Sequence, residues 1–248
     1  MKKLIPILIA VLAMIAVPTK AATCPTGVSL SGGGYTNANG TGNGFSCTIG
    51  NLTFSNFSFT SSAAGSASAM TPAGVTVTPL PNSSFPGVPD GFLFTEALSA
   101  NNTLNTGVTT NSDMTIFYSV TSNGATLTDL ELGFNGSVSG TGITEVTENF
   151  CLNTTAGVFG CAYASSGQIQ VINPPGIFNT SVTFAPVTML SVEKDVQLNA
   201  GTNGGVSLSS IDNMYSQTVP ESASLTLLGL GLLGLALAKR SKLGQLSL

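Results

Sequence analysis

The sequence predicts an all-β protein, with an antiparallel β-sandwich or jelly-roll-like domain over residues 23–218. Only 7% of the residues are charged, and the strong helix formers Glu, Lys, Arg and Gln are scarce. Short runs rich in Val, Ile, Thr and Phe alternate with small polar residues, which is the pattern of half-buried strands. Clusters of Gly, Asn, Pro and Ser separate these runs, as turns do. A hydrophobic segment flanks the domain on each side.

Residues 1–22 have the three parts of a secretory signal peptide. Two lysines come first, an apolar run follows over residues 4–17, and small residues place cleavage after Ala21 or Ala22. The apolar run is shorter than the ~20 residues that span a bilayer, which argues against a retained anchor. We therefore expect export, with signal peptidase as a partner.

About ten segments of the domain are predicted as strands. The first, residues 47–60, shows an alternating apolar pattern made by Ile49, Leu52, Phe54, Phe57 and Phe59. The others, in chain order, are residues 75–80, 91–95, 114–120, 127–134, 143–150, 168–172, 181–187, 189–198 and 206–211. A parallel β-solenoid is the competing architecture, but no fixed repeat period is present.

Three segments between or after these strands have loop character. Residues 60–74 and 80–91 are small, polar and proline-bearing, and they are predicted as surface loops. Residues 199–218 combine a Gly-rich turn, a last strand and a short tether that ends the domain.

The charge balance excludes one class of partner. Between Ala22 and Val219 the chain has one cation, Lys194, and ten carboxylates, so this part carries a net charge of −9. Nucleic-acid binding needs Lys and Arg at phosphates, so we expect no nucleic-acid partner. The same balance disfavours docking on anionic lipid.

Four cysteines occur, and the chain has no histidine, so neither a zinc site nor a thioredoxin-like motif is predicted. An even number of cysteines in an exported chain favours disulfides, with three possible connectivities. We expect Cys24–Cys47 and Cys151–Cys161, because each closes a short loop and contributes about 3 kcal/mol.

The residues available for catalysis are few. Without histidine, neither a Ser–His–Asp nor a Cys–His arrangement can be built. Two carboxylate pairs remain, Glu145 with Glu148 and Asp129 with Glu131. In strands the first pair points to opposite faces and the second shares a face, so we expect solvated polar positions and no enzymatic activity.

Lys194 is the one candidate for a Ser–Lys dyad. Glu193 and Asp195 flank it and favour its charged form, so we expect a surface ion pair instead. No acidic loop with calcium-ligand spacing is present, and we expect no metal or other cofactor.

Carbohydrate binding is the alternative function for the domain. Sugar-binding faces rely on exposed aromatic side chains, but this chain has no Trp and four Tyr. Its Phe residues lie at strand positions that core packing explains. The alternative stays open.

The second hydrophobic segment is short for a membrane span. Residues 223–238 are uncharged, and as a helix they rise only about 24 Å against a hydrocarbon thickness of roughly 30 Å. Lys239, Arg240 and Lys242 follow, and positive charge stays cytoplasmic. This orientation leaves the domain on the exported side.

Residues 219–242 resemble the PEP-CTERM sorting signal of exported Gram-negative bacterial proteins. Val219, Pro220 and Glu221 match the core of its Val-Pro-Glu-Pro motif, and Ser222 stands where the second proline is usual. The Gly-interrupted apolar segment and the basic cluster match the rest of the signal, and residues 243–248 extend beyond it.

This resemblance implies that an exosortase recognises the motif during transient insertion in the inner membrane and removes the tail. The product would then lie in the cell envelope, at the surface or in an exopolysaccharide or biofilm matrix. The expected role is structural or adhesive, with a carbohydrate-binding module as the alternative.

Overall fold

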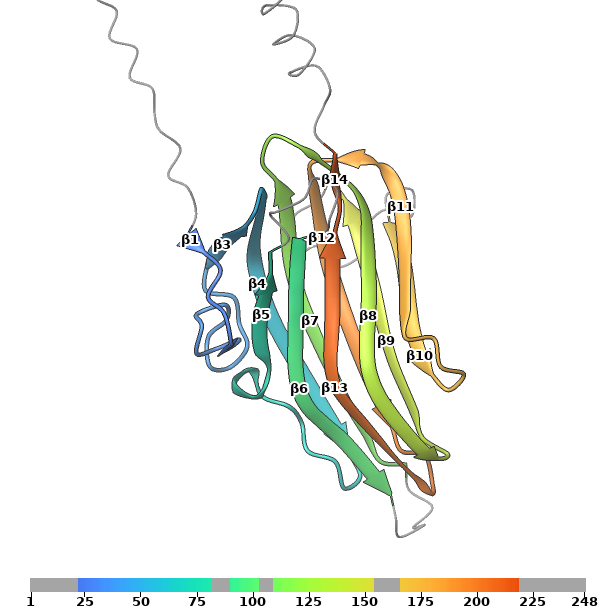
Figure 1. Ribbon diagram of the computed structural model, residues 1–248. Helices are drawn as coiled ribbons and strands as arrows, with labels where there is room; N and C mark the ends of the chain where they lie inside the picture. The colour runs from blue at the N-terminus through green and yellow to red at the C-terminus, as the bar shows by residue number, and fades with distance from the viewer. Residues whose placement is uncertain (1–21, 82–89, 103–108, 154–165, 219–248) are drawn as a thin grey trace, which may run out of the picture.

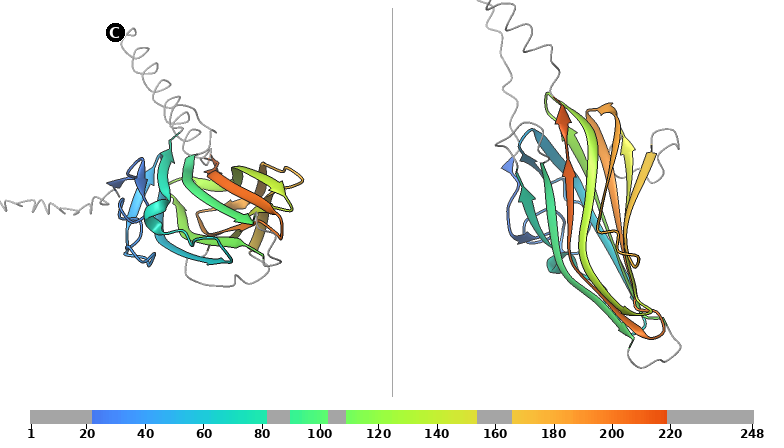
Figure 2. Two further views of the ribbon diagram at one scale, coloured as in Figure 1. Left: turned by 90° about the horizontal axis from the view of Figure 1, so that it is seen from below. Right: turned by 45° about the vertical axis from the view of Figure 1, so that its right-hand side comes forward.

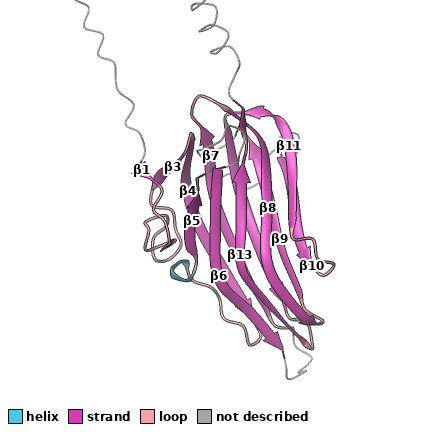
Figure 3. Ribbon diagram, in the orientation of Figure 1, coloured by secondary structure: helices cyan, strands magenta, loops and turns pink. Residues whose placement is uncertain are grey.

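The computed structural model describes residues 22–81, 90–102, 109–153 and 166–218, and its strands form two sheets packed face to face (Figures 1 and 3). Sheet A has the strand order β1 (Ala22–Thr23), β3 (Ser46–Ile49), β4 (Leu52–Ala64), β7 (Asn111–Ser122), β12 (Met189–Asn199), β9 (Ile143–Leu152) and β10 (Ser166–Asn173). Sheet B has the order β11 (Asn179–Val187), β8 (Thr126–Gly140), β13 (Gly204–Tyr215), β6 (Asp90–Asn102), β5 (Thr76–Leu80) and β2 (Val28–Ser29), and β14 (Gln217–Thr218) pairs with β8. The predicted all-β sandwich is therefore confirmed.

The pairing is antiparallel throughout these strands except between β1 and β3, which run parallel. Seen from below, the two sheets form two layers (Figure 2). A short 3-10 helix, η1 (Pro72–Gly74), lies between β4 and β5.

Every segment predicted as a strand contains one, but residues 47–60 form the β3–β4 hairpin, with a turn at residues 50–51, and not a single strand. Two loop boundaries were also wrong. Residues 60–64 continue β4, because they pair with β7 as far as Asn111. Residues 217–218 are strand β14 and not a free tether, because Gln217 pairs with Leu127. Most of the predicted loop 80–91 lies outside the described residues.

A β-bulge in β4 explains why two phenylalanines three positions apart both enter the core. The register with β7 shifts between Ser55 and Ser58, and Asn56 has a φ of 57°. The extra residue restores the inward direction for Phe57, so Phe54 and Phe57 are both buried.

Aromatic side chains join the two sheets. Phe54 of sheet A and Phe92 of sheet B contact with ring centroids 4.5 Å apart. Phe57 and Tyr118 of sheet A stack at 5.5 Å, and Phe92 also contacts Tyr118. These rings are buried, so aromatic packing holds the interface next to the polar cluster described below.

Both ends of the described domain lie toward the same end of the sandwich, where β1 and β14 are seen in Figure 1. Gln217 Nε2 donates to Asp90 Oδ2 at 3.3 Å. The Asp90 carboxyl also packs on the β3–β4 turn, where Gly50 has a φ of +55° and an added Cβ would lie 2.4 Å from Asp90 Oδ2. Cys24 N donates to the carbonyl of Thr48 in β3. Both ends of the described domain therefore lie close to β3 and the β3–β4 turn.

Candidate functional site

A charged pair lies at the interface between the sheets. Lys194 of β12 and Glu148 of β9 are direct partners across neighbouring strands, and both side chains point into the sandwich. Lys194 Nζ donates to Glu148 Oε2, and both side chains are 0% exposed. A buried charge of either sign needs such a partner, since neither has access to water.

Asn213 of β13 reaches this pair from the opposite sheet. Its Nδ2 donates to Glu148 Oε1 at 3.2 Å and to the carbonyl oxygen of Glu131 at 2.9 Å. Glu148 therefore binds Lys194 with one carboxyl oxygen and Asn213 with the other. The two nitrogens are held beside each other on one carboxyl group.

Two tyrosines complete the cluster. The hydroxyls of Tyr118 and Tyr215 both donate to Asn213 Oδ1, the latter at 2.6 Å, and their oxygens are 2.8 Å apart. Both phenols are fully buried. The amide of Asn213 is thus held at both ends, by phenols at its oxygen and by Glu148 and a backbone carbonyl at its nitrogen. We call these five residues the buried polar cluster.

Burial changes the acidity of the cluster. It raises the pKa of the Glu148 carboxyl above its ordinary 4.5, although Lys194 and Asn213 act in the opposite direction. It also raises the pKa values of Tyr118 and Tyr215 well above 10, so both phenols keep their protons.

Glu96 of β6 is a further acid at the interface. It is 4% exposed, and neither carboxyl oxygen has a hydrogen-bond partner in the structure. Burial raises its pKa to about 8, even though the charge of Lys194 acts in the opposite direction. Glu96 is therefore mostly protonated at neutral pH.

The structure corrects two expectations about these residues. Lys194 does not form a surface ion pair, because alternation along β12 turns it inward while Glu193 and Asp195 face outward. Glu148 is not a solvated position, since it points into the core. Glu145 does point to the opposite face, as predicted, and accepts from Gln170 Nε2 at 2.7 Å.

The other predicted carboxylate pair shares one face of β8. Asp129 and Glu131 of β8 lie away from the core, as expected for alternate strand positions. Asp129 Oδ1 accepts from the backbone amide of Ser216 at 3.0 Å, which fixes the chain just before β14. This contact gives Asp129 a structural role.

Outward-facing carboxylates gather on sheet A. Asp113 of β7 contacts Asp195 of β12, and burial together with the charge of Asp195 raises the pKa of Asp113. Burial and the same neighbour raise the pKa of Glu193. Among the described residues, no group of three His, Cys, Asp or Glu is arranged to hold a metal ion.

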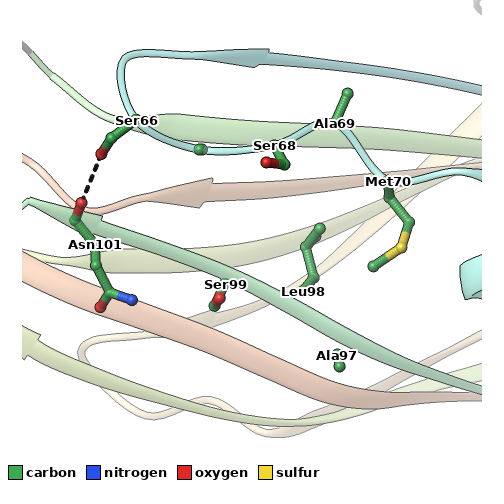
Figure 4. Close-up of a pocket in the computed structure, with 9 residues that line it drawn as sticks. Ser66, Ser68, Ala69, Met70, Ala97, Leu98, Ser99 and Asn101 are labelled. Atoms are coloured by element: carbon green, nitrogen blue, oxygen red, sulfur yellow. Dashed lines mark hydrogen bonds between the residues drawn. The ribbon is translucent and has the colours of Figure 1, made fainter.

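A groove of about 400 Å³ lies beside β6 (Figure 4). β5 pairs with β6 only over residues 91–95, and the segment 66–70 runs along the rest of that edge. Ser66 Oγ donates to the carbonyl of Asn101 at 2.9 Å and tethers the segment. Hydroxyl, amide and small apolar side chains line the groove, from Ser66, Ala67, Ser68, Ala69, Met70, Ala97, Leu98, Ser99 and Asn101.

One predicted disulfide is present. Cys24 and Cys47 are bonded and join the segment after β1 to β3. For the second predicted bridge, Cys151 is buried in β9, but Cys161 lies outside the described residues. That pairing stays a prediction.

The predicted signal peptide, except for Ala22, and the sorting residues lie outside the described ranges. The latter are Val219, Pro220, Glu221, Ser222, Lys239, Arg240 and Lys242. Within residues 22–218, leaving out the undescribed gaps, no helix is long and apolar enough to cross a membrane.

Sequence reasoning missed Asn213, Tyr118, Tyr215 and Glu96 as members of a site. A signal for each was present, because each occupies an inward position in an alternating strand. Asn213 falls between Ile211 and Tyr215, in phase with both. A polar residue in the buried phase of a strand is the feature to look for.

Comparison with known proteins leaves the chain without an assigned family. No protein-family model and no curated protein matches it. A solved structure of TmCBM61 with β-1,4-galactotriose has a TM-score of 0.27 and 6% identity, covering 62% of this chain and 86% of that one. A glycosylation-associated protein complex from Streptococcus agalactiae has a TM-score of 0.29 and 9% identity, covering 64% and 26%.

A third solved structure is the enzymatically active domain of tailspike protein 4 from bacteriophage CBA120, with a TM-score of 0.23 and 13% identity, covering 77% of this chain and 21% of that one. This chain thus spans about a quarter or less of the last two proteins. These likenesses are too weak to support a function.

Proposed function

We propose that this chain is an exported, non-enzymatic domain with a structural or adhesive role at the cell surface or in the extracellular matrix, sorted through its C-terminal segment by an exosortase-type system. The observation that carries the proposal is the Cys24–Cys47 disulfide. Disulfides persist in oxidising compartments, and this one begins just after the predicted signal-peptide cleavage site.

The charge of the described surface supports an extracellular structural role. Lys194, the only cation between Ala22 and Val219, is fully buried. The side chains that the described part presents to solvent are therefore neutral or acidic. Such a surface favours solubility and repels anionic polymers. Contacts with such polymers would have to be made by neutral groups.

The position of the chain ends fits attachment through the C-terminus that sorting would leave near residue 220. β14 ends the described domain at Thr218, directly before the sorting motif, and β1 lies toward the same end (Figure 1). The β8–β9 and β12–β13 turns lie at the opposite end. A domain attached through this new C-terminus would present that opposite end to its surroundings.

The experiment is expression of wild type, Glu221→Ala and a matched Ser224→Ala control in an exosortase-positive Gram-negative host. We expect the exported wild type and Ser224→Ala to lose the chain from near residue 220 onward, and Glu221→Ala to retain it. Equal processing of all three proteins would contradict the sorting assignment. Retention of the tail by wild type would reduce residues 219–242 to an ordinary anchor.

The groove beside β6 supports carbohydrate binding as a second candidate function. Its hydroxyl and amide groups suit neutral sugar hydroxyls, and none of its lining residues is charged. Aromatic stacking has little support, since Tyr35, Tyr118 and Tyr215 are all buried. Retardation of the exported protein in gels containing soluble polysaccharides tests this function. Asn101→Ala should abolish retardation, whereas the exposed Asn179→Ala on β11, at the other edge of sheet B, should not. No retardation of wild type would exclude the polysaccharides used.

A further inference from the structure

We propose that Lys194 and Asn213 become joined by an intramolecular amide bond, which covalently links strand β12 of sheet A to strand β13 of sheet B. Lys194 Nζ attacks Cγ of the Asn213 side chain, the C–Nδ2 bond breaks, and ammonia leaves. No oxidant, metal or other co-reactant is consumed.

Geometry holds the two reacting groups together before the reaction. Lys194 Nζ donates to Glu148 Oε2, and Asn213 Nδ2 donates to Glu148 Oε1 at 3.2 Å. The nucleophile and the leaving group therefore bind the two oxygens of a single carboxyl group. Such fixed proximity replaces an encounter between free reactants.

Glu148 is placed to move the protons. It first takes a proton from the Lys194 ammonium, which leaves a neutral amine able to attack. It then takes the second amine proton as the new bond forms and passes one to Nδ2, so that ammonia departs and Glu148 ends protonated. Burial raises the pKa of Glu148, which favours its protonated form.

Tyr118 and Tyr215 are placed to stabilise the negative charge that forms during the attack. Attack at Cγ places negative charge on Asn213 Oδ1, and both phenol hydroxyls already donate to that oxygen. Donors fixed in advance at a developing oxyanion stabilise the transition state. The tyrosines cannot compete as bases, because burial raises their pKa values.

The surroundings favour the amide over hydrolysis. Lys194, Glu148, Asn213, Tyr118 and Tyr215 are each fully buried or nearly so. Exclusion of water keeps the electrostatic contacts strong and suppresses hydrolytic side reactions.

The amide bond would suit the proposed surface role. The test of the bond does not depend on that role. Asn213 lies on the strand that leads through β14 to Thr218, where the sorting segment begins. A load applied at the C-terminus left by sorting would enter sheet B at this strand. The amide bond would pass that load directly to sheet A.

A tryptic digest of the full chain tests the proposal, because trypsin does not cleave after an acylated lysine. Lys194 is the only Lys or Arg between Lys20 and Lys239. After denaturation, reduction and alkylation, we expect an undivided 21–239 fragment, or its processed equivalent, about 17 Da lighter than its sequence mass because ammonia is lost. Two fragments divided after Lys194 at their full masses would overturn the proposal.

Three controls make the readout specific. Lys194→Arg must be cut after residue 194, which shows that the site is accessible to trypsin. Asn213→Ala must restore cleavage after Lys194 at full mass, and because the digest uses denatured protein, the result does not require the variant to fold. Glu148→Gln should likewise restore cleavage.

The mass deficit separates competing reactions. A loss of about 18 Da with Lys194 protected would indicate condensation with a carboxyl group such as Glu148 or Glu96, and would contradict the assignment to Asn213. A loss of about 17 Da with normal cleavage after Lys194 would indicate cyclisation of an asparagine and would also overturn the proposal.

Discussion

Glu148 Oε1 accepts a hydrogen bond of 3.2 Å from Asn213 Nδ2, although the two residues belong to opposite sheets of the sandwich. Lys194 binds the other oxygen of the same carboxyl group. The centre of this apolar domain is therefore a complete polar arrangement that includes a nucleophile, a proton carrier and an amide. Unmatched charge here would be costly, since the low dielectric of the interior penalises it.

Glu148→Gln should destabilise the domain strongly. It prevents the proposed amide bond and leaves the Lys194 ammonium buried without its carboxylate, and a buried charge that has lost its partner costs about 3–5 kcal/mol of unfolding free energy. Glu145→Gln on the outward face of the same strand is the matched control and should cost less than about 0.5 kcal/mol. Urea unfolding measures both, and equal losses would contradict a central role for Glu148.

Glu96 should make the stability depend on pH. Its pKa rises from 4.5 to about 8 on folding because the carboxyl is buried, so the folded state holds the proton more tightly. Its contribution is therefore fully present below pH 4.5 and is lost as pH rises to about 8, by on the order of 3–5 kcal/mol in all.

Urea unfolding at several pH values between 5 and 8 measures this effect. Glu96→Gln should remove most of the decline, because the amide cannot ionise. The exposed Glu131→Gln is the control and should keep the wild-type slope. Identical slopes for all three proteins would mean that Glu96 does not titrate in this window.

The fold could be predicted from sequence because alternation reports which face of a strand is buried. Val192, Val196 and Leu198 alternate in β12 and are buried as predicted. The bulge at Asn56 shows where simple alternation ends, since one extra residue resets the phase. Strand boundaries were less accurate where polar residues such as those at 60–64 complete a strand by backbone pairing.

The buried polar cluster was not predicted, because its meaning depends on contacts between distant strands. The surface ion pair of Lys194 was predicted from its sequence neighbours Glu193 and Asp195. In the strand, those two side chains point outward and Lys194 points inward. Its real partner, Glu148, is adjacent only through the pairing of β12 with β9. Asn213 joins them only because the two sheets pack face to face.

Replacing both Cys24 and Cys47 with Ser should lower the unfolding free energy by about 3 kcal/mol, because the bond closes a loop with a sequence separation of 23. Thermal unfolding under non-reducing conditions measures the change. Ser46→Ala, at an exposed neighbouring position, is the control. An unchanged midpoint in the double variant would show that the bridge is dispensable for stability.

Export and sorting are tested most directly by the intact mass of the protein recovered from the surface or medium of an exosortase-positive host. We expect a chain that begins at residue 22 or 23 and ends near residue 220. The mass lost as ammonia from Lys194 and Asn213 is measured separately, and that measurement does not depend on where the chain begins or ends. An exported protein that still carries residues 223–248 would contradict sorting through the C-terminal segment, whatever the state of Lys194.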